Sequence, residues 1–183
     1  MKNKSEQGFT YIDVMIAIVI LLVGILALLS AITGAIFQSQ GQQQQLAAKQ
    51  IAASAMESIM SVKETDTDRL GWNSVGNVGS NVVNGVSKGI FVTGFQPALP
   101  NAGSDEIIGT ADDTGTALPG FQRQIVISDE CDTERPSPAP VCTTPGDFSV
   151  KFRSVVITVT YFVGSVQRQE VLRTVLTDYY IAN

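Results

Sequence analysis

The feature that most constrains this chain is a long apolar run near its amino end. Residues 14–37 are VMIAIVILLVGILALLSAITGAIF, and no charged residue occurs between Asp13 and Lys49. At about 1.5 Å per residue, a helix over this run is about 35 Å long, and about 20 apolar residues suffice to cross the core of a bilayer. The sequence therefore predicts a transmembrane helix over residues 9–37.

A short polar segment, MKNKSEQG, precedes the apolar run. Its Lys2 and Lys4 favour a cytoplasmic amino end by the positive-inside rule, so the carboxyl-terminal side of the helix lies across the membrane. A secretory signal peptide also starts with basic residues, but its apolar core has only about 7–15 residues. The alternative to a retained helix is cleavage after Ala31 or Ala35.

A single carboxylate, Asp13, stands at the start of the apolar run. A charged side chain costs about 2.5–3.5 kcal/mol at the centre of a bilayer and less near the interface, so such a group usually has a partner. Cleavage between Gly8 and Phe9 would create a positive amine about one helical turn from Asp13. The alternative is that Asp13 lies at the level of the lipid headgroups, where water and the helix dipole stabilise it.

The amino-terminal residues resemble the motif of the type IV prepilins and pseudopilins. That motif is a short basic leader ending in Gly, then Phe, an acid four residues after the Phe, and about twenty apolar residues. Here the three parts are KNKSEQG, FTYID and VMIAIVILLVGILALL. The resemblance covers only about the first thirty residues. It is greatest to the minor pilins called type IV pilus modification proteins (PilV), and next to the minor pseudopilins of type II secretion.

The resemblance implies that residues 1–8 are a leader, which a prepilin peptidase removes between Gly8 and Phe9, and that Phe9 is then N-methylated. It also implies storage in the inner membrane as a single-pass protein with a periplasmic domain. An inner-membrane assembly platform would then build the subunit into a filament with other pilins, where Asp13 neutralises the Phe9 amine of an adjacent subunit. The chain departs from the family in having Asp13 where Glu is usual, and in lacking the helix proline of many major pilins.

Residues 38–63 are expected to continue the same helix as an amphipathic segment. At helical spacing, one face carries apolar side chains: Ala48, Ile51, Ala52, Ala55, Met56, Ile59 and Val62. The opposite face carries Gln50, Ser54, Glu57 and Ser61. The alternative is a glutamine-rich flexible linker between two separate helices, since QSQGQQQQ is a low-complexity segment.

Residues 64–120 are predicted to be largely irregular, because they are rich in Gly, Asn, Ser and Asp. A short apolar run over residues 90–92 is the one candidate strand there. Four acids lie in this region: Asp105, Glu106, Asp112 and Asp113. We expect a solvated acidic loop; the alternative is a bound calcium ion, although the spacing does not fit an EF-hand.

Residues 121–183 are predicted to form an antiparallel sheet. Apolar residues alternate with polar ones in two segments, with Phe121, Ile125 and Ile127 in the first and Val155, Ile157, Val159 and Tyr161 in the second. Gly164-Ser165 predicts a type II′ turn into a return strand over residues 166–177. The apolar phase changes between Phe152 and Val155, which suggests a bulge near Arg153. The expected fold class is α+β, a pilin-like roll with one long helix packed on a small sheet.

The two cysteines, Cys131 and Cys142, enclose a proline-rich loop and are predicted to form a disulfide. By the chain-entropy model, closing such a loop contributes about 3 kcal/mol. The loop is either a rigid contact feature or a staple for a strand connection.

Composition argues against an enzyme. The chain contains no histidine, which removes the commonest general base and the commonest metal ligand, and no cofactor or metal is expected. Its net charge is −5, so the chain as a whole does not attract the phosphates of a nucleic acid, and no nucleic acid partner is expected. Three functions remain: a minor pilin, a minor pseudopilin of type II secretion, and a membrane-anchored binding or adhesion domain that does not assemble.

Overall fold

A computed structural model describes residues 10–65, 70–130 and 152–178. Gly8, Phe9, Cys131 and Cys142 lie outside the described residues, so the leader cleavage, the N-methylation and the disulfide stay predictions. The chain divides into two compact units, residues 1–43 and residues 44–183.

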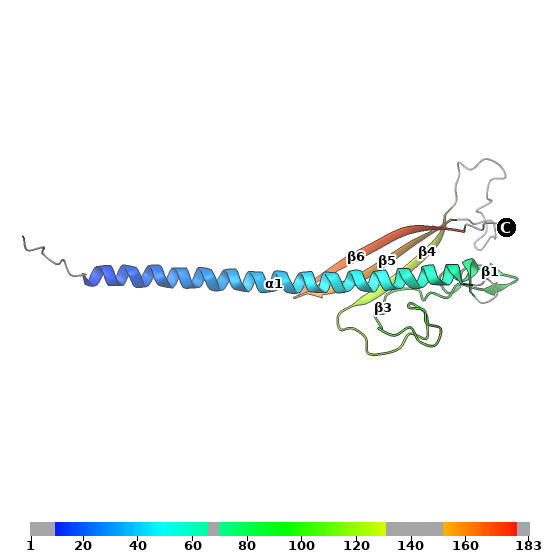
Figure 1. The fold of residues 1–183 in the computed structure, drawn as a ribbon, viewed down its shortest axis with the longest axis horizontal. Coiled ribbons are helices and arrows are strands. Elements are labelled where there is room, and N and C mark those ends of the chain that lie inside the picture. The colour runs from blue at the N-terminus through cyan, green and yellow to red at the C-terminus, as the bar shows by residue number, and fades with distance from the viewer. Residues whose placement is uncertain (1–9, 66–69, 131–151, 179–183) are drawn as a thin grey trace, which may run out of the picture. The chain divides into compact units, whose positions relative to one another are not determined.

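One helix, α1 (Tyr11–Glu64), contributes to both units (Figure 1). It is continuous through the glutamine cluster, so the prediction of one helix is confirmed and the flexible-linker alternative is wrong. In the first unit, the helical residues up to Phe37 are all exposed, including the large apolar ones. The most apolar stretch has a mean hydropathy of 3.1, so α1 is a candidate membrane span or signal sequence by length and composition.

In the second unit, one face of α1 packs on a sheet. Ala48, Ala52, Ala55, Ile59 and Val62 are buried, and Ile51 and Met56 are partly buried against the same core. The four polar residues predicted on the opposite face are all exposed. Three of the five buried helix residues are alanines. The predicted amphipathic face is therefore confirmed.

The main sheet has four antiparallel strands in the order β3-β4-β5-β6 (Figure 1). The strands are β3 (Gln96–Pro97), β4 (Gln122–Glu130), β5 (Phe152–Val163) and β6 (Val166–Thr177). One face of β5 supplies the core with Val155, Ile157, Val159 and Tyr161. With the long helix preceding the antiparallel sheet, the α+β fold class is confirmed.

The hairpin between β5 and β6 forms at the predicted turn. Val163 pairs with Val166 across Gly164-Ser165. Gly164 has a φ of 62°, and Ser165 is not among the described residues with positive φ. Positive φ at the first central position alone is the pattern of a type II′ turn, and the predicted return strand over residues 166–177 is confirmed.

Residues 70–121 are mostly loops with short regular pieces: η1 (Trp72–Ser74), β1 (Val82–Val83) and β2 (Val86–Ser87). The β1–β2 hairpin turns at Asn84-Gly85, where both residues have positive φ, as a type I′ turn requires. The predicted strand over residues 90–92 is wrong. Only a single bridge forms there, between Phe91 and Asn77, although Phe91 itself is fully buried in the core.

The side chain of Asn77 replaces a strand at the edge of β4. Its Nδ2 donates to the carbonyl of Ile125 at 2.9 Å, and its Oδ1 accepts from the amide of Ile127 at 2.8 Å. A carboxamide carries one acceptor and one donor group, as a peptide unit does. Asn77 therefore satisfies backbone groups of β4 beyond the short stretch that β3 covers.

The predicted bulge near Arg153 is wrong, because Arg153 itself occupies a core position. It pairs with Asp129 of β4 and with Leu176 of β6 in an uninterrupted register. The buried residues of β5 therefore alternate from Arg153 to Tyr161 without a phase change. Phe152 lies on the opposite face, so the apparent shift in the apolar pattern came from a charged residue at an inward position.

The Arg153 guanidinium has partners on its Nε, its Nη1 and one face. Its Nε donates to Asp129 Oδ1 at 3.0 Å, and its Nη1 donates to the carbonyls of Trp72 and Val75. The guanidinium carbon lies 4.4 Å from the centre of the Trp72 ring, within the range of a cation–π contact. Burial lowers the pKa of Arg153, and the hydrogen bond with Asp129 opposes that effect. Arg153 thus ties β5 to the loop that carries Trp72.

We expect Arg153→Ala to lower the free energy of unfolding by about 3 kcal/mol or more, because Asp129 and two backbone carbonyls lose their donor. The measurement is denaturation of the full chain in detergent micelles, followed by the fluorescence of Trp72, the only tryptophan. Arg173→Ala is the matched control, since Arg173 is exposed in β6 and should change stability by less than about 0.5 kcal/mol. Equal effects of the two substitutions would contradict the assigned role.

Candidate functional site

The first candidate site is the amino end of α1, where Thr10 and Asp13 form a reciprocal cap. The carbonyl of Thr10 accepts the amide of Asp13 at 3.0 Å. In return, Asp13 Oδ2 accepts from the Thr10 amide at 3.1 Å and from the Thr10 hydroxyl at 2.7 Å. The first amides of a helix have no partner within it, and an acid three residues after the cap commonly satisfies one of them.

This cap leaves one oxygen of Asp13 available. Both hydrogen bonds fall on Oδ2, and within the described part of the chain Oδ1 accepts none. The carboxylate borders an apolar surface of the helix made by Val14, Ala17, Ile18 and Leu21. Phe9, the expected partner of Asp13, lies outside the described residues, so the predicted pairing stays a prediction. The contact with Thr10 was not predicted, although the spacing T-x-x-D resembles a capping box.

The second candidate site is the acidic loop over residues 104–113. Asp112 Oδ2 accepts from the Ser104 amide and hydroxyl at 2.8 Å each, and from the Asp105 amide at 3.2 Å. Its Oδ1 accepts from the Thr110 hydroxyl at 2.7 Å. These bonds, that from Thr110 most strongly, hold the pKa of Asp112 well below its ordinary value. Asp112 therefore holds the two ends of this loop together, because it accepts hydrogen bonds from residues 104, 105 and 110.

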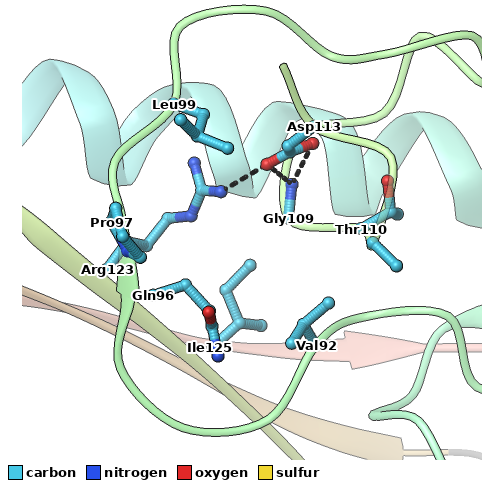
Figure 2. A pocket seen from close by; sticks show the side chains of 10 residues that line it. Val92, Gln96, Pro97, Leu99, Gly109, Thr110, Asp113, Arg123 and Ile125 are labelled. Atoms are coloured by element: carbon cyan, nitrogen blue, oxygen red, sulfur yellow. Dashed lines mark hydrogen bonds and ion pairs between the residues drawn. The ribbon is translucent and has the colours of Figure 1, made fainter. Parts of the chain in front are cut away.

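Asp113 points the other way, into the domain. Its Oδ2 lies 2.8 Å from Nη2 of Arg123 on β4, and both oxygens accept from the amide of Gly109 (Figure 2). The exposed fraction of the side chain is 6% for Asp113 and 4% for Arg123. The predicted exposure of the acidic loop is confirmed for Glu106. It is wrong for Asp113, whose side chain is buried. Among the residues that the structure describes, no three acids, cysteines or histidines gather to hold a metal ion.

Gly109 is required where it lies. Its φ is 105°, and a Cβ there would come within 2.5 Å of Ile125 Cδ1. The glycine lets the loop pass close to Ile125 of β4 in a backbone conformation with positive φ, while its amide donates to Asp113 of the same loop. A further bond, from the amide of Ile108 to the Ser58 hydroxyl at 3.1 Å, fastens the same loop to α1.

Beside the Asp113–Arg123 ion pair lies a cavity of about 280 Å³ (Figure 2). Its walls come from three segments: the chain around β3, the acidic loop, and the core face of β4. They consist of Val92, Gln96, Pro97, Leu99, Gly109, Thr110, Ala111, Asp113, Arg123 and Ile125. The site combines one buried ion pair with mostly apolar walls, which is the usual character of a small-molecule site.

Sequence analysis did not predict Arg123 as an inward residue. The strand pattern had assigned Phe121, Ile125 and Ile127 to the core, and Arg123 falls between them at the same alternation. A signal was therefore present in the phase of the strand. Its partner Asp113 lies in an irregular loop, whose sequence has no periodicity from which an inward direction could be predicted.

Comparisons with protein-family models, with curated proteins and with solved structures found no match to this chain. Its function must therefore be inferred from its own residues and their geometry.

The acidic loop predicts a specific response to acid. The ordinary pKa of Asp112 is 3.8, and its hydrogen bonds in the folded chain lower that pKa. Its contribution to stability is therefore complete above pH 3.8 and is lost as the pH falls from there toward the folded value. Asp112→Asn should lower stability at neutral pH and reduce the further loss of stability below pH 3.8, as measured by denaturation at a series of pH values.

The matched control for Asp112→Asn is Glu106→Gln, since Glu106 is an exposed acid of the same loop. That variant should keep the acid response of the unchanged chain. If Asp112→Asn also kept the full response, the low pKa of Asp112 would not contribute to stability.

Proposed function

We propose that this chain is a minor pilin-like structural subunit of a type IV pilus. In this proposal a prepilin peptidase removes residues 1–8, Phe9 is N-methylated, and the mature subunit joins or primes the filament. The observation that carries the proposal is a single carboxylate, Asp13, at the start of a helical segment whose apolar side chains are all exposed. No catalytic step, metal or cofactor forms part of it.

The exposed apolar segment supports the first step of the argument. Side chains of Val, Ile and Leu surround the helix between Val14 and Phe37, and an apolar surface of that extent requires a nonaqueous environment. Lipid and neighbouring apolar helices provide similar surroundings. One helix can therefore hold the subunit in the inner membrane before assembly and in a filament core after it.

The geometry at Asp13 supports the second step. Its Oδ2 is engaged by Thr10, which fixes the carboxylate at the first turn, while Oδ1 accepts no hydrogen bond from the described residues. An unpaired charge is costly in either apolar environment. A positive amine at Phe9 of an adjacent subunit would remove that cost and would fix how far one helix is shifted along the next.

The first test is the mass of the amino-terminal peptide of the mature protein, from cells with and without prepilin peptidase. The proposal expects a peptide that begins at N-methylated Phe9 and that disappears when the peptidase is absent. A chain that begins at Met1, or just after Ala31 or Ala35, would exclude the pilin class. An anchored or secreted domain would then remain.

The second test separates charge pairing from helix capping at Asp13. Asp13→Asn keeps an acceptor for the Thr10 amide and hydroxyl but removes the negative charge, so we expect normal membrane insertion and at least tenfold less subunit in sheared filaments. Thr10→Ala removes the hydroxyl contact but keeps the charge, and should leave incorporation nearly unchanged. The readout is the amount of subunit in the membrane and filament fractions.

Unchanged incorporation of the Asp13→Asn variant would exclude charge pairing. A loss shared equally by Thr10→Ala would assign Asp13 to capping alone. A filament required for protein secretion rather than for surface pili would place the same subunit in a type II secretion system.

A further inference from the structure

The cavity beside β4 contains hydrogen-bond donors that the fold does not use. Arg123 donates to Asp113 through Nη2, and within the described residues its Nε and Nη1 donate to nothing. Arg153, the other buried arginine of the sheet, has partners on its Nε, its Nη1 and its ring face. Although the Arg123 side chain is 96% buried, these two nitrogens are not among the described buried polar atoms that lack a partner, so they can be reached from the cavity that Arg123 lines.

A second polar side chain of the same cavity, the exposed Gln96, offers a hydrogen-bond acceptor rather than a donor. Gln96 of β3 donates through Nε2 to the carbonyl of Thr93 at 3.1 Å. Its Oε1 accepts no hydrogen bond from the part of the chain that the structure describes. The cavity therefore has donors at Arg123 and an acceptor at Gln96 (Figure 2), and the surfaces around them are apolar, from Val92, Pro97, Leu99, Ala111 and Ile125.

The charges around the cavity favour a neutral ligand. Arg123 already has a carboxylate partner in Asp113, so the pair is neutral as a whole. A ligand carboxylate would add a second negative charge near Asp113, on a chain whose net charge is already −5. An uncharged carbonyl oxygen accepts from the same nitrogens without that repulsion.

We propose that this cavity binds a small uncharged molecule that carries a secondary amide. The amide carbonyl accepts from Nε or Nη1 of Arg123, the amide N–H donates to Gln96 Oε1, and the adjoining alkyl group contacts the apolar walls. With a volume of about 280 Å³, the cavity lies at the lower end of ligand-site sizes, so it fits one acetamido sugar or one peptide unit. This site belongs to the second unit, and it is independent of the filament proposal.

The test observes Arg123 directly. The full chain, labelled with ¹⁵N-arginine and held in a detergent without amide groups, has six arginines and hence six Nε–Hε signals. Arg123→Lys identifies the signal of Arg123. Two probes are titrated to about 100 mM, so that millimolar dissociation constants are measured: N-acetylglucosamine, and the peptide analogue N-acetylalanine N-methylamide. Glucose and acetate are the controls, since the first lacks the amide and the second carries a charge.

We expect one or both amide probes to shift the Arg123 signal with saturation, and the tighter binder to identify the ligand as sugar or peptide. Ala111→Leu fills the cavity without changing Arg123, Asp113 or Gln96, so it should keep the Arg123 signal and weaken binding at least tenfold. Three results would each overturn the proposal. These are no saturable shift with either amide, an equal response to acetate or glucose, and unchanged binding in Ala111→Leu.

Discussion

The packing of one small-residue helix face on the sheet is the contact on which the rest of the second unit depends. Ala48, Ala52 and Ala55 lie on the buried side of α1, in one core cluster with the inward residues of β5. Any polar group on the core face of the sheet is thereby removed from water and must find a partner within the protein. Among the residues that the structure describes, Arg123 and Arg153 are the two buried charged residues in that position.

The two arginines meet this requirement in different ways. Arg153 receives its partners from two segments: Asp129 on the adjacent strand, and the loop over residues 72–75, which supplies two carbonyls and the indole ring of Trp72. Such a group is locked and has a structural role. Arg123 has one carboxylate partner and a cavity beside it. The same residue type in the same layer thus has several partners at one place and a single carboxylate at the other, where a cavity adjoins it, and that difference is the basis of the proposed ligand site.

The sequence predicted the elements whose signals are local and failed where partners come from far along the chain. The amphipathic face from Ala48 to Val62 and the turn at Gly164-Ser165 follow from periodicity and from the backbone freedom of glycine, and both are present. The phase change at Arg153 suggests a bulge, whereas the residue points inward to Trp72 and Asp129, partners that are distant in sequence. Arg123 and Asp113 are only ten residues apart, but Asp113 lies in an irregular loop whose sequence has no periodicity from which to place it. Asn84-Gly85 is a local hairpin signal as well, although the composition around it indicates loops.

The small side chains of the α1 face also affect how the domain is made. Residues 48–62 leave the ribosome long before β5 and β6, the strands that cover them, because chains are synthesised from the amino end. A nascent helix with a leucine-rich face would expose a large adhesive surface during that delay. A face made mostly of alanine exposes little apolar area per turn. Until the sheet is made, this part of the helix therefore exposes little apolar surface for aggregation. The large exposed apolar side chains of α1 are concentrated in the segment up to Phe37.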